Sequence, residues 1–210
     1  MHTLNKCAYY FGIACHRIGL GSGLVYSDPP AKVADGIYIG SIATTDRADL
    51  LRGAEIGTIV NLSGLVVRGN VYTVDLIMED EPITPKTLPN YVHEFSRGLD
   101  AITAARASGH NVLVNCAAGI NRSATLIGLW LIIAKRMTYF DAVEAIESAN
   151  KLRGLPALTN LSFRDFLLNA YVICDDQDRK RSRKKLTRGV ARDSPGGYRP
   201  VGGSCRVVIV

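Results

Sequence analysis

The sequence lacks an apolar run long enough to cross a membrane as a helix. His16 and Arg17 interrupt the apolar stretch near the start of the chain, and Lys135 and Arg136 end the one near its middle. A transmembrane helix needs about 20 consecutive apolar residues, so we expect no membrane association. No small-residue cleavage pattern follows the apolar residues 7–15, which argues against a secretory signal.

Cysteine and histidine are few, and their spacing suits neither disulfides nor metal. The five cysteines stand at positions 7, 15, 116, 174 and 205, without the close, even spacing of a disulfide framework or the paired spacing of a zinc site. His93 and His110 have no His or Cys at metal-ligand spacing. We therefore expect an intracellular protein, in the cytoplasm or the nucleus, that uses no metal or other cofactor.

Excess charge is absent from most of the chain and concentrated at its end. The net charge is +6, and residues 175–210 account for all of it with ten Lys and Arg against four Asp. We predict a basic, disordered tail there, to which nucleic acid could bind, although nothing favours such a partner. Residues 1–32 are too apolar for a free tail, and the expectation for them is a helical extension that packs on the domain or forms a homodimer.

The pattern between these ends predicts one α/β domain over residues 33–174. Short β-branched runs predict strands at 37–40, 58–63, 71–77 and 112–115. Apolar positions three or four apart predict a helix from 88 to 102, and a strongly apolar segment predicts another from 122 to 134. Thr138 with Asp141 resembles a capping box that starts a third helix, and a last helix is expected from 161 to 173. Strands first and mostly helices later favour a central, mostly parallel sheet flanked by helices.

Residues 112–132, VLVNCAAGINRSATLIGLWLI, join a buried strand to an apolar helix through a short loop. Such a loop can aim successive backbone N–H groups at one point, and the helix N-terminus adds its positive dipole. This geometry binds a tetrahedral oxyanion. The predicted oxyanion-binding residues are Ala117, Ala118, Gly119, Ile120, Asn121 and Arg122.

Three side chains at the ends of this loop suit nucleophilic catalysis. The field of the loop favours the thiolate of Cys116 over its thiol, which makes it a nucleophile at neutral pH. Arg122 offers a planar fork that can hold two phosphoryl oxygens. Ser123 is placed to hydrogen-bond the thiolate when it becomes a leaving group.

Together these residues resemble the signature of the cysteine-dependent protein phosphatases: Cys, five residues, Arg, then Ser or Thr. The segments ADGIYIGS at 34–41, GTIVNLSG at 57–64 and LPALTNLSF at 155–163 are similar to flanks of the dual-specificity branch. The resemblance implies a metal-free α/β phosphatase that hydrolyses phosphotyrosine and phosphoserine or phosphothreonine in proteins through a phosphocysteine. The chain is similar to small, atypical members of this branch, and CAAGINRS is also similar to versions in large DNA viruses.

The same resemblance suggests further site residues. Asp80 matches the family's general acid, although it lies 36 residues before Cys116, a few more than usual, and Glu79 is the alternative. Asn160 resembles an Asn that braces the phosphate loop, but it could equally start a helix. Asn115 replaces the usual His before the nucleophile. Asn can hold the loop by hydrogen bonds but carries no positive charge, so we expect a less stabilised thiolate.

Two other functions stay open beside protein dephosphorylation. RNA 5′-triphosphatases share the fold and chemistry, and Asn121 and the basic tail are compatible with them, but they usually carry His at the position of Ala118. Phosphoinositide phosphatases usually have Lys in the loop, and AAGIN has none. A non-catalytic phosphoprotein-binding module is suggested by Asn115 alone and ranks last, because the nucleophile, arginine and serine are all present.

Overall fold

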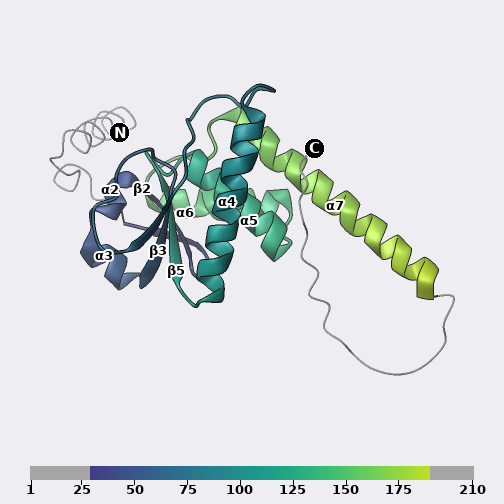
Figure 1. Ribbon diagram of the computed structural model, residues 1–210, viewed down its shortest axis with the longest axis horizontal. Helices are drawn as coiled ribbons and strands as arrows, with labels where there is room; N and C mark the ends of the chain where they lie inside the picture. Colours follow the sequence, from purple (N-terminus) through teal and green to yellow (C-terminus); the bar gives the residue numbers. More distant parts are fainter. Residues whose placement is uncertain (1–28, 190–210) are drawn as a thin grey trace.

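The computed structural model describes residues 29–189, in which one mixed sheet carries helices on both faces (Figure 1). The strands are β1 (Ala31–Ala34), β2 (Ile37–Ser41), β3 (Ile56–Asn61), β4 (Tyr72–Asp75) and β5 (Asn111–Cys116). Their order is β1-β2-β5-β3-β4, with β1 antiparallel to β2 and the other pairs parallel. The predicted α/β fold with a mostly parallel sheet is confirmed.

The helices divide between the two faces of the sheet. The short α2 (Ile42–Thr45) and α3 (Ala48–Gly53) lie on one side in Figure 1. On the other side lie α4 (Leu88–Ala107), α5 (Arg122–Lys135) and the long α7 (Leu161–Gly189), and α6 (Tyr139–Leu152) joins α5 to α7. Within the described residues, no helix combines the length and the apolar character that crossing a membrane requires.

The central strand β5 is buried on both faces. Val112 and Val114 belong to the main core beneath the long helices, whereas Leu113 points the other way, into a smaller core with Leu51 and Ile59. A strand buried on both faces reads as a continuous apolar run, as residues 112–114 do. Cys116 therefore lies at the carboxyl edge of the most protected strand.

The structure corrects the predicted start of the domain. Ala31 pairs with Ile39, so β1 begins before residue 33, inside the segment predicted to be a separate extension. Sequence reasoning also missed α2 and α3, which are too short to show a periodic pattern. The strand predicted for 71–77 is shorter, because the chain leaves the sheet after Asp75. The rest of the predicted extension, residues 1–28, lies outside the described residues.

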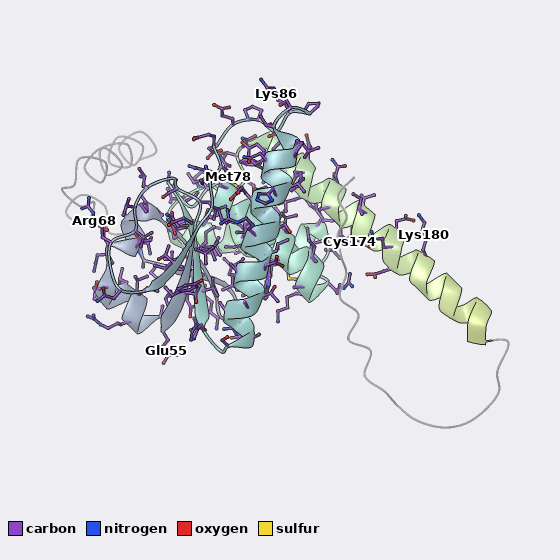
Figure 2. The ribbon with its side chains drawn as sticks, in the orientation of Figure 1. Glu55, Arg68, Met78, Lys86, Cys174 and Lys180 are labelled. Atoms are coloured by element: carbon purple, nitrogen blue, oxygen red, sulfur yellow. The ribbon has the colours of Figure 1, made fainter. Side chains whose placement is uncertain are left out.

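The basic tail is a second correction, because α7 continues through Gly189 where disorder was predicted from residue 175. Lys and Arg are good helix formers, and cations near a helix C-terminus interact favourably with its dipole. Asp176 pairs with Lys180 one turn on, and Asp178 pairs with Arg136 at the end of α5. Figure 2 shows Cys174 near the domain and Lys180 farther along the helix. Residues 190–210 lie outside the described part.

Gly98 lets α4 approach α5 closely. A Cβ at this position would lie 2.6 Å from Leu126 Cδ2 and 2.9 Å from Leu76 Cδ1. We expect Gly98→Ala to lower the free energy of unfolding by about 1–3 kcal/mol through overpacking, measured by urea denaturation. Gly53→Ala is the control, because no atom lies within 4 Å of the added Cβ, and this variant should not be destabilised. Equal stability of both variants would contradict the close approach.

Candidate active site

The loop between β5 and α5 forms the floor of the site. Cys116 ends β5, Arg122 begins α5, and the backbone N–H of Thr125 donates to the carbonyl of Asn121 at the start of the helix. The first amides of a helix have no acceptor within it, and the dipole favours an anion there. The loop that is predicted to bind an oxyanion therefore lies between a strand end and a helix start.

Gly119 is required by the shape of the loop. Its φ of +74° is a conformation that side-chain-bearing residues rarely adopt. A Cβ there would lie 2.6 Å from the carbonyl oxygen of Gly40 in the neighbouring strand β2. The glycine thus allows the loop both to turn and to lie against the sheet.

Two residues that sequence reasoning missed support the loop from outside. Asn150 Nδ2 donates to the carbonyl of Gly119 at 2.7 Å, and the Arg153 guanidinium donates to the carbonyl of Ala118 at 2.9 Å. Arg153 also donates to Asn150 Oδ1 at 2.7 Å, so the two side chains act together. Both are buried at the end of α6. The one sequence signal for them is a pair of polar residues three apart on an otherwise apolar helix face.

Cys116 is buried, and its thiol receives hydrogen bonds from the loop. Its Sγ accepts from the backbone N–H of Gly119 at 3.2 Å and from Ser123 Oγ at 3.3 Å. Burial raises the pKa of Cys116, but the positive charge of Arg122 and the hydrogen bonds from Ser123 and the loop amides outweigh it. The net result is a pKa below the ordinary value of a cysteine, which favours the thiolate.

The Arg122 guanidinium is anchored through Nη1, whereas its Nε makes no hydrogen bond among the described residues. Its Nη1 donates to the carbonyls of Leu62 at 2.8 Å and Met78 at 3.1 Å, and Met78 is labelled in Figure 2. Its buried Nε has no hydrogen-bond partner among the described residues. Buried donors are nearly always satisfied, so Nε is available for an oxyanion in the loop.

Asp80 comes to the same place from the segment after β4. Its carboxylate accepts from Asn121 Nδ2, and its Oδ2 lies 3.9 Å from Arg122 Nε. The alternative, Glu79, contributes its backbone carbonyl as an acceptor for the Tyr91 hydroxyl. Among the described contacts, none joins the Glu79 carboxylate to the loop. The structure therefore brings Asp80, and not Glu79, to the loop.

Asn115 differs from expectation, because its side chain does not hold the phosphate loop. Its Nδ2 donates to Asn61 Oδ1 on β3 at 3.0 Å, and Asn61 Nδ2 in turn donates to Asp75 on β4 at 2.7 Å. The backbone N–H of Ser63 also donates to Asn61 Oδ1, which fixes the orientation of that amide. Asn115 thus ties three neighbouring strands together directly beside the nucleophile.

Asn160 both starts a helix and contacts the phosphate loop, and it does so through different atoms. Its side chain accepts from the backbone N–H of Ser162 at 3.2 Å, which caps the start of α7. Its backbone N–H donates to Asn121 Oδ1 in the phosphate loop at 3.0 Å. The side chain therefore starts the helix, and the contact with the loop is made by the backbone.

The assembled groups are a buried thiol with a lowered pKa, a loop of backbone amides with a buried arginine, and a carboxylate. The sulfur of Cys116 accepts from a loop amide, and Asp80 lies 3.9 Å from Arg122 Nε. Such a set can transfer a phosphoryl group to sulfur and exchange a proton with the leaving oxygen. Within residues 29–189 there is no cluster of His, Cys, Asp and Glu side chains arranged to hold a metal ion.

Comparison with known families agrees with this chemistry. The family described as "Dual specificity phosphatase, catalytic domain" matches residues 37–171, well over half of the chain. The chain therefore belongs to the dual specificity phosphatase family. A relative from Arabidopsis thaliana, dual specificity protein phosphatase 1, is 24% identical over 57% of this chain and 59% of its own length. A MAP kinase phosphatase with leucine-rich repeats from Dictyostelium discoideum is 28% identical over 57% of this chain and 14% of its own.

Solved structures show the same fold. A mouse putative dual specificity phosphatase has a TM-score of 0.61 at 25% identity, over 73% of this chain and 92% of its own. Human DUSP28 has a TM-score of 0.57 at 21% identity, over 69% of this chain and 96% of its own. Both are covered almost completely, as expected for a small member of the family. The chain spans 59% or less of the relatives from Arabidopsis and Dictyostelium named above.

The lowered pKa of Cys116 can be tested by alkylation against pH. Iodoacetamide labelling of the Cys116 peptide, followed by mass spectrometry, should keep its rate to lower pH in the folded protein than in urea, because the thiolate persists below the ordinary thiol pKa. Ser123→Ala and Arg122→Met should move this pH profile upward, since each removes a group that lowers the pKa.

Arg97→Met is the matched control, because this arginine pairs with Glu94 on α4. Its profile should coincide with that of the unchanged protein. Identical profiles for the folded and the urea-unfolded chain would contradict the activated thiolate.

Proposed function

We propose that this chain is a protein phosphatase that hydrolyses phosphotyrosine and phosphoserine or phosphothreonine through a phosphocysteine at Cys116. The observation that carries the proposal is the buried Nε of Arg122, which makes no hydrogen bond among the described residues and lies 3.9 Å from Asp80 Oδ2, in a loop whose amide already donates to the Cys116 sulfur. A phosphoryl group in the loop would complete the hydrogen bonding of that guanidinium. Tungstate is, like phosphate, a tetrahedral oxyanion, and the mouse relative was solved with zinc tungstate.

The first step would transfer the phosphoryl group to sulfur. Cys116 Sγ attacks phosphorus, the bond from phosphorus to the Ser, Thr or Tyr oxygen breaks, and protonated Asp80 gives its proton to that oxygen. Arg122 and the loop amides hold the equatorial oxygens while charge moves. The asymmetry of Arg122 suits this task, because Nη1 is anchored to backbone carbonyls and Nε is not.

The second step would return the enzyme to its starting state. The Asp80 carboxylate accepts a proton from water, the water oxygen bonds to phosphorus, and the sulfur–phosphorus bond breaks to release inorganic phosphate. Ser123 donates to the departing thiolate from 3.3 Å. Because its pKa is lowered, Cys116 is also a better leaving group than a cysteine with an ordinary pKa.

A panel of substrates tests this function on the full chain. We expect phosphate release from a phosphotyrosine peptide and a phosphothreonine peptide, and none from triphosphate-ended RNA. Cys116→Ser should abolish turnover and keep peptide binding, because the alcohol is far less acidic but the loop and Arg122 remain. Faster turnover of the RNA would make the chain an RNA 5′-triphosphatase. Peptide binding without turnover by the unchanged chain would make it a binding module.

The identity of the acid has its own prediction. Asp80→Asn should lower kcat roughly a hundredfold on a phosphothreonine peptide, and much less on p-nitrophenyl phosphate, whose leaving group needs little protonation. Glu79→Gln is the matched control and should leave both rates near those of the unchanged enzyme. If Glu79→Gln gives the leaving-group pattern instead, the assignment of the acid to Asp80 is wrong.

A further inference from the structure

The side chain of Asn121 joins the phosphate loop to two other segments at once. Its Nδ2 lies 3.2 Å from Asp80 Oδ1 and 3.4 Å from Asp80 Oδ2. Its Oδ1 accepts from Thr159 Oγ1 at 3.2 Å and from the backbone N–H of Asn160 at 3.0 Å. Because a backbone N–H can only donate, the amide oxygen must face Asn160 and the amide nitrogen must face Asp80.

We propose that Asn121 is a positioning residue that holds the Asp80 carboxyl group in place for proton transfer. The inference rests on the proposed function, in which Asp80 is the acid. Asn121 does not take part in the chemistry through its side chain. It fixes the rotamer of the group that does.

The segment around Asp80 has anchored backbone atoms but a weakly held carboxylate. The Tyr91 hydroxyl donates to the carbonyls of Glu79 and Glu81, on either side of Asp80. The backbone N–H of Ile83 donates to Ser162 Oγ at 2.9 Å. These contacts fix the path of the chain, but they do not fix the rotamer of the Asp80 side chain.

Substrate binding would remove the other polar neighbour of that carboxylate. Arg122 Nε lies 3.9 Å from Asp80 Oδ2, beyond hydrogen-bond distance, and it is the atom available to a phosphoryl oxygen. Once a phosphate occupies Nε, the amide of Asn121 is the remaining described donor to the carboxylate. Asp80 would then depend on Asn121 for its position at the moment of reaction.

A neutral amide suits a group that must alternate between two protonation states. An amide N–H can donate to the carboxylate and to the carbonyl oxygen of the protonated acid alike. A cationic donor would favour the carboxylate and oppose the acid form that the first step needs. Asn121 can therefore hold one carboxyl oxygen of Asp80 through both steps while the other exchanges the proton.

The experiment measures kcat and KM of the full chain with two leaving groups. Asn121→Ala should lower kcat about tenfold on a phosphothreonine peptide, as expected for the loss of one hydrogen bond, and have little effect on p-nitrophenyl phosphate. KM should change little, because the backbone of the phosphate loop is retained. In the Asp80→Asn background the same substitution should cause no further loss.

Matched variants separate positioning from folding. Thr159→Val removes one donor to Asn121 Oδ1 and leaves the Asn160 N–H, so a smaller loss with the same leaving-group pattern is expected. Asn121→Asp is nearly isosteric but places like charges together, and it should be slower than Asn121→Ala. Asn169 is an exposed asparagine on α7, and the control variant Asn169→Ala should retain full activity. The rate of Cys116 alkylation should be unchanged in Asn121→Ala.

Three results would overturn the proposal. If Asn121→Ala lowers kcat equally on both substrates, and this loss adds to the loss caused by Asp80→Asn, then Asn121 supports the phosphate loop itself. Unchanged kcat in Asn121→Ala would mean that Asp80 holds its own position. If Asp80→Asn lacks the leaving-group pattern, the acid assignment fails and this inference fails with it, whereas the first two results leave that assignment intact.

Discussion

The site depends on how the surrounding groups offset the electrostatic cost of placing a negative charge on the buried Cys116 sulfur. Cys116 is 1% exposed, and burial alone would favour its neutral thiol. The pKa is nevertheless lowered, because the end of a central strand, the start of a helix and a buried arginine converge within one short loop. The order of the strands serves the same requirement, since β5 lies between β2 and β3 and brings Cys116 to the middle of the carboxyl edge.

Rigid support of the loop is the second requirement, because dipoles stabilise a charge best when they are already oriented. Asn150 and Arg153 hold the loop carbonyls from α6, and Gly119 permits the turn that the amides need. Arg122 is anchored in the same way by two backbone carbonyls. In the function proposed above, a loop held in this way would bind an oxyanion without spending binding energy on its own ordering.

Local pattern predicts the parts of this site that are contiguous in the chain, whereas Asp80, which also reaches the loop, is identified only through the family resemblance. Cys116, Arg122 and Ser123 lie in one segment between a strand and a helix, so their proximity follows from local structure. Asn150 and Arg153 reach the loop by the packing of α6, and Asn61 reaches Asn115 across the sheet. No local pattern encodes those contacts. The helix beyond residue 175 was missed for another reason, because charge composition outweighed the helix propensity of Lys and Arg in the prediction.

Because Asn115 replaces a histidine, the groups that contact the Cys116 sulfur do not change their charge with pH. A histidine beside the thiolate would gain and lose charge near pH 6.5. The groups that touch Cys116 or stand beside it here are an arginine, a hydroxyl and backbone or side-chain amides, and none of them changes charge between acidic and neutral conditions. As the medium acidifies, the groups in direct contact with the sulfur therefore keep the same charge. Among the groups that contact the Cys116 sulfur, none therefore adds an ionisation of its own to that of the thiol.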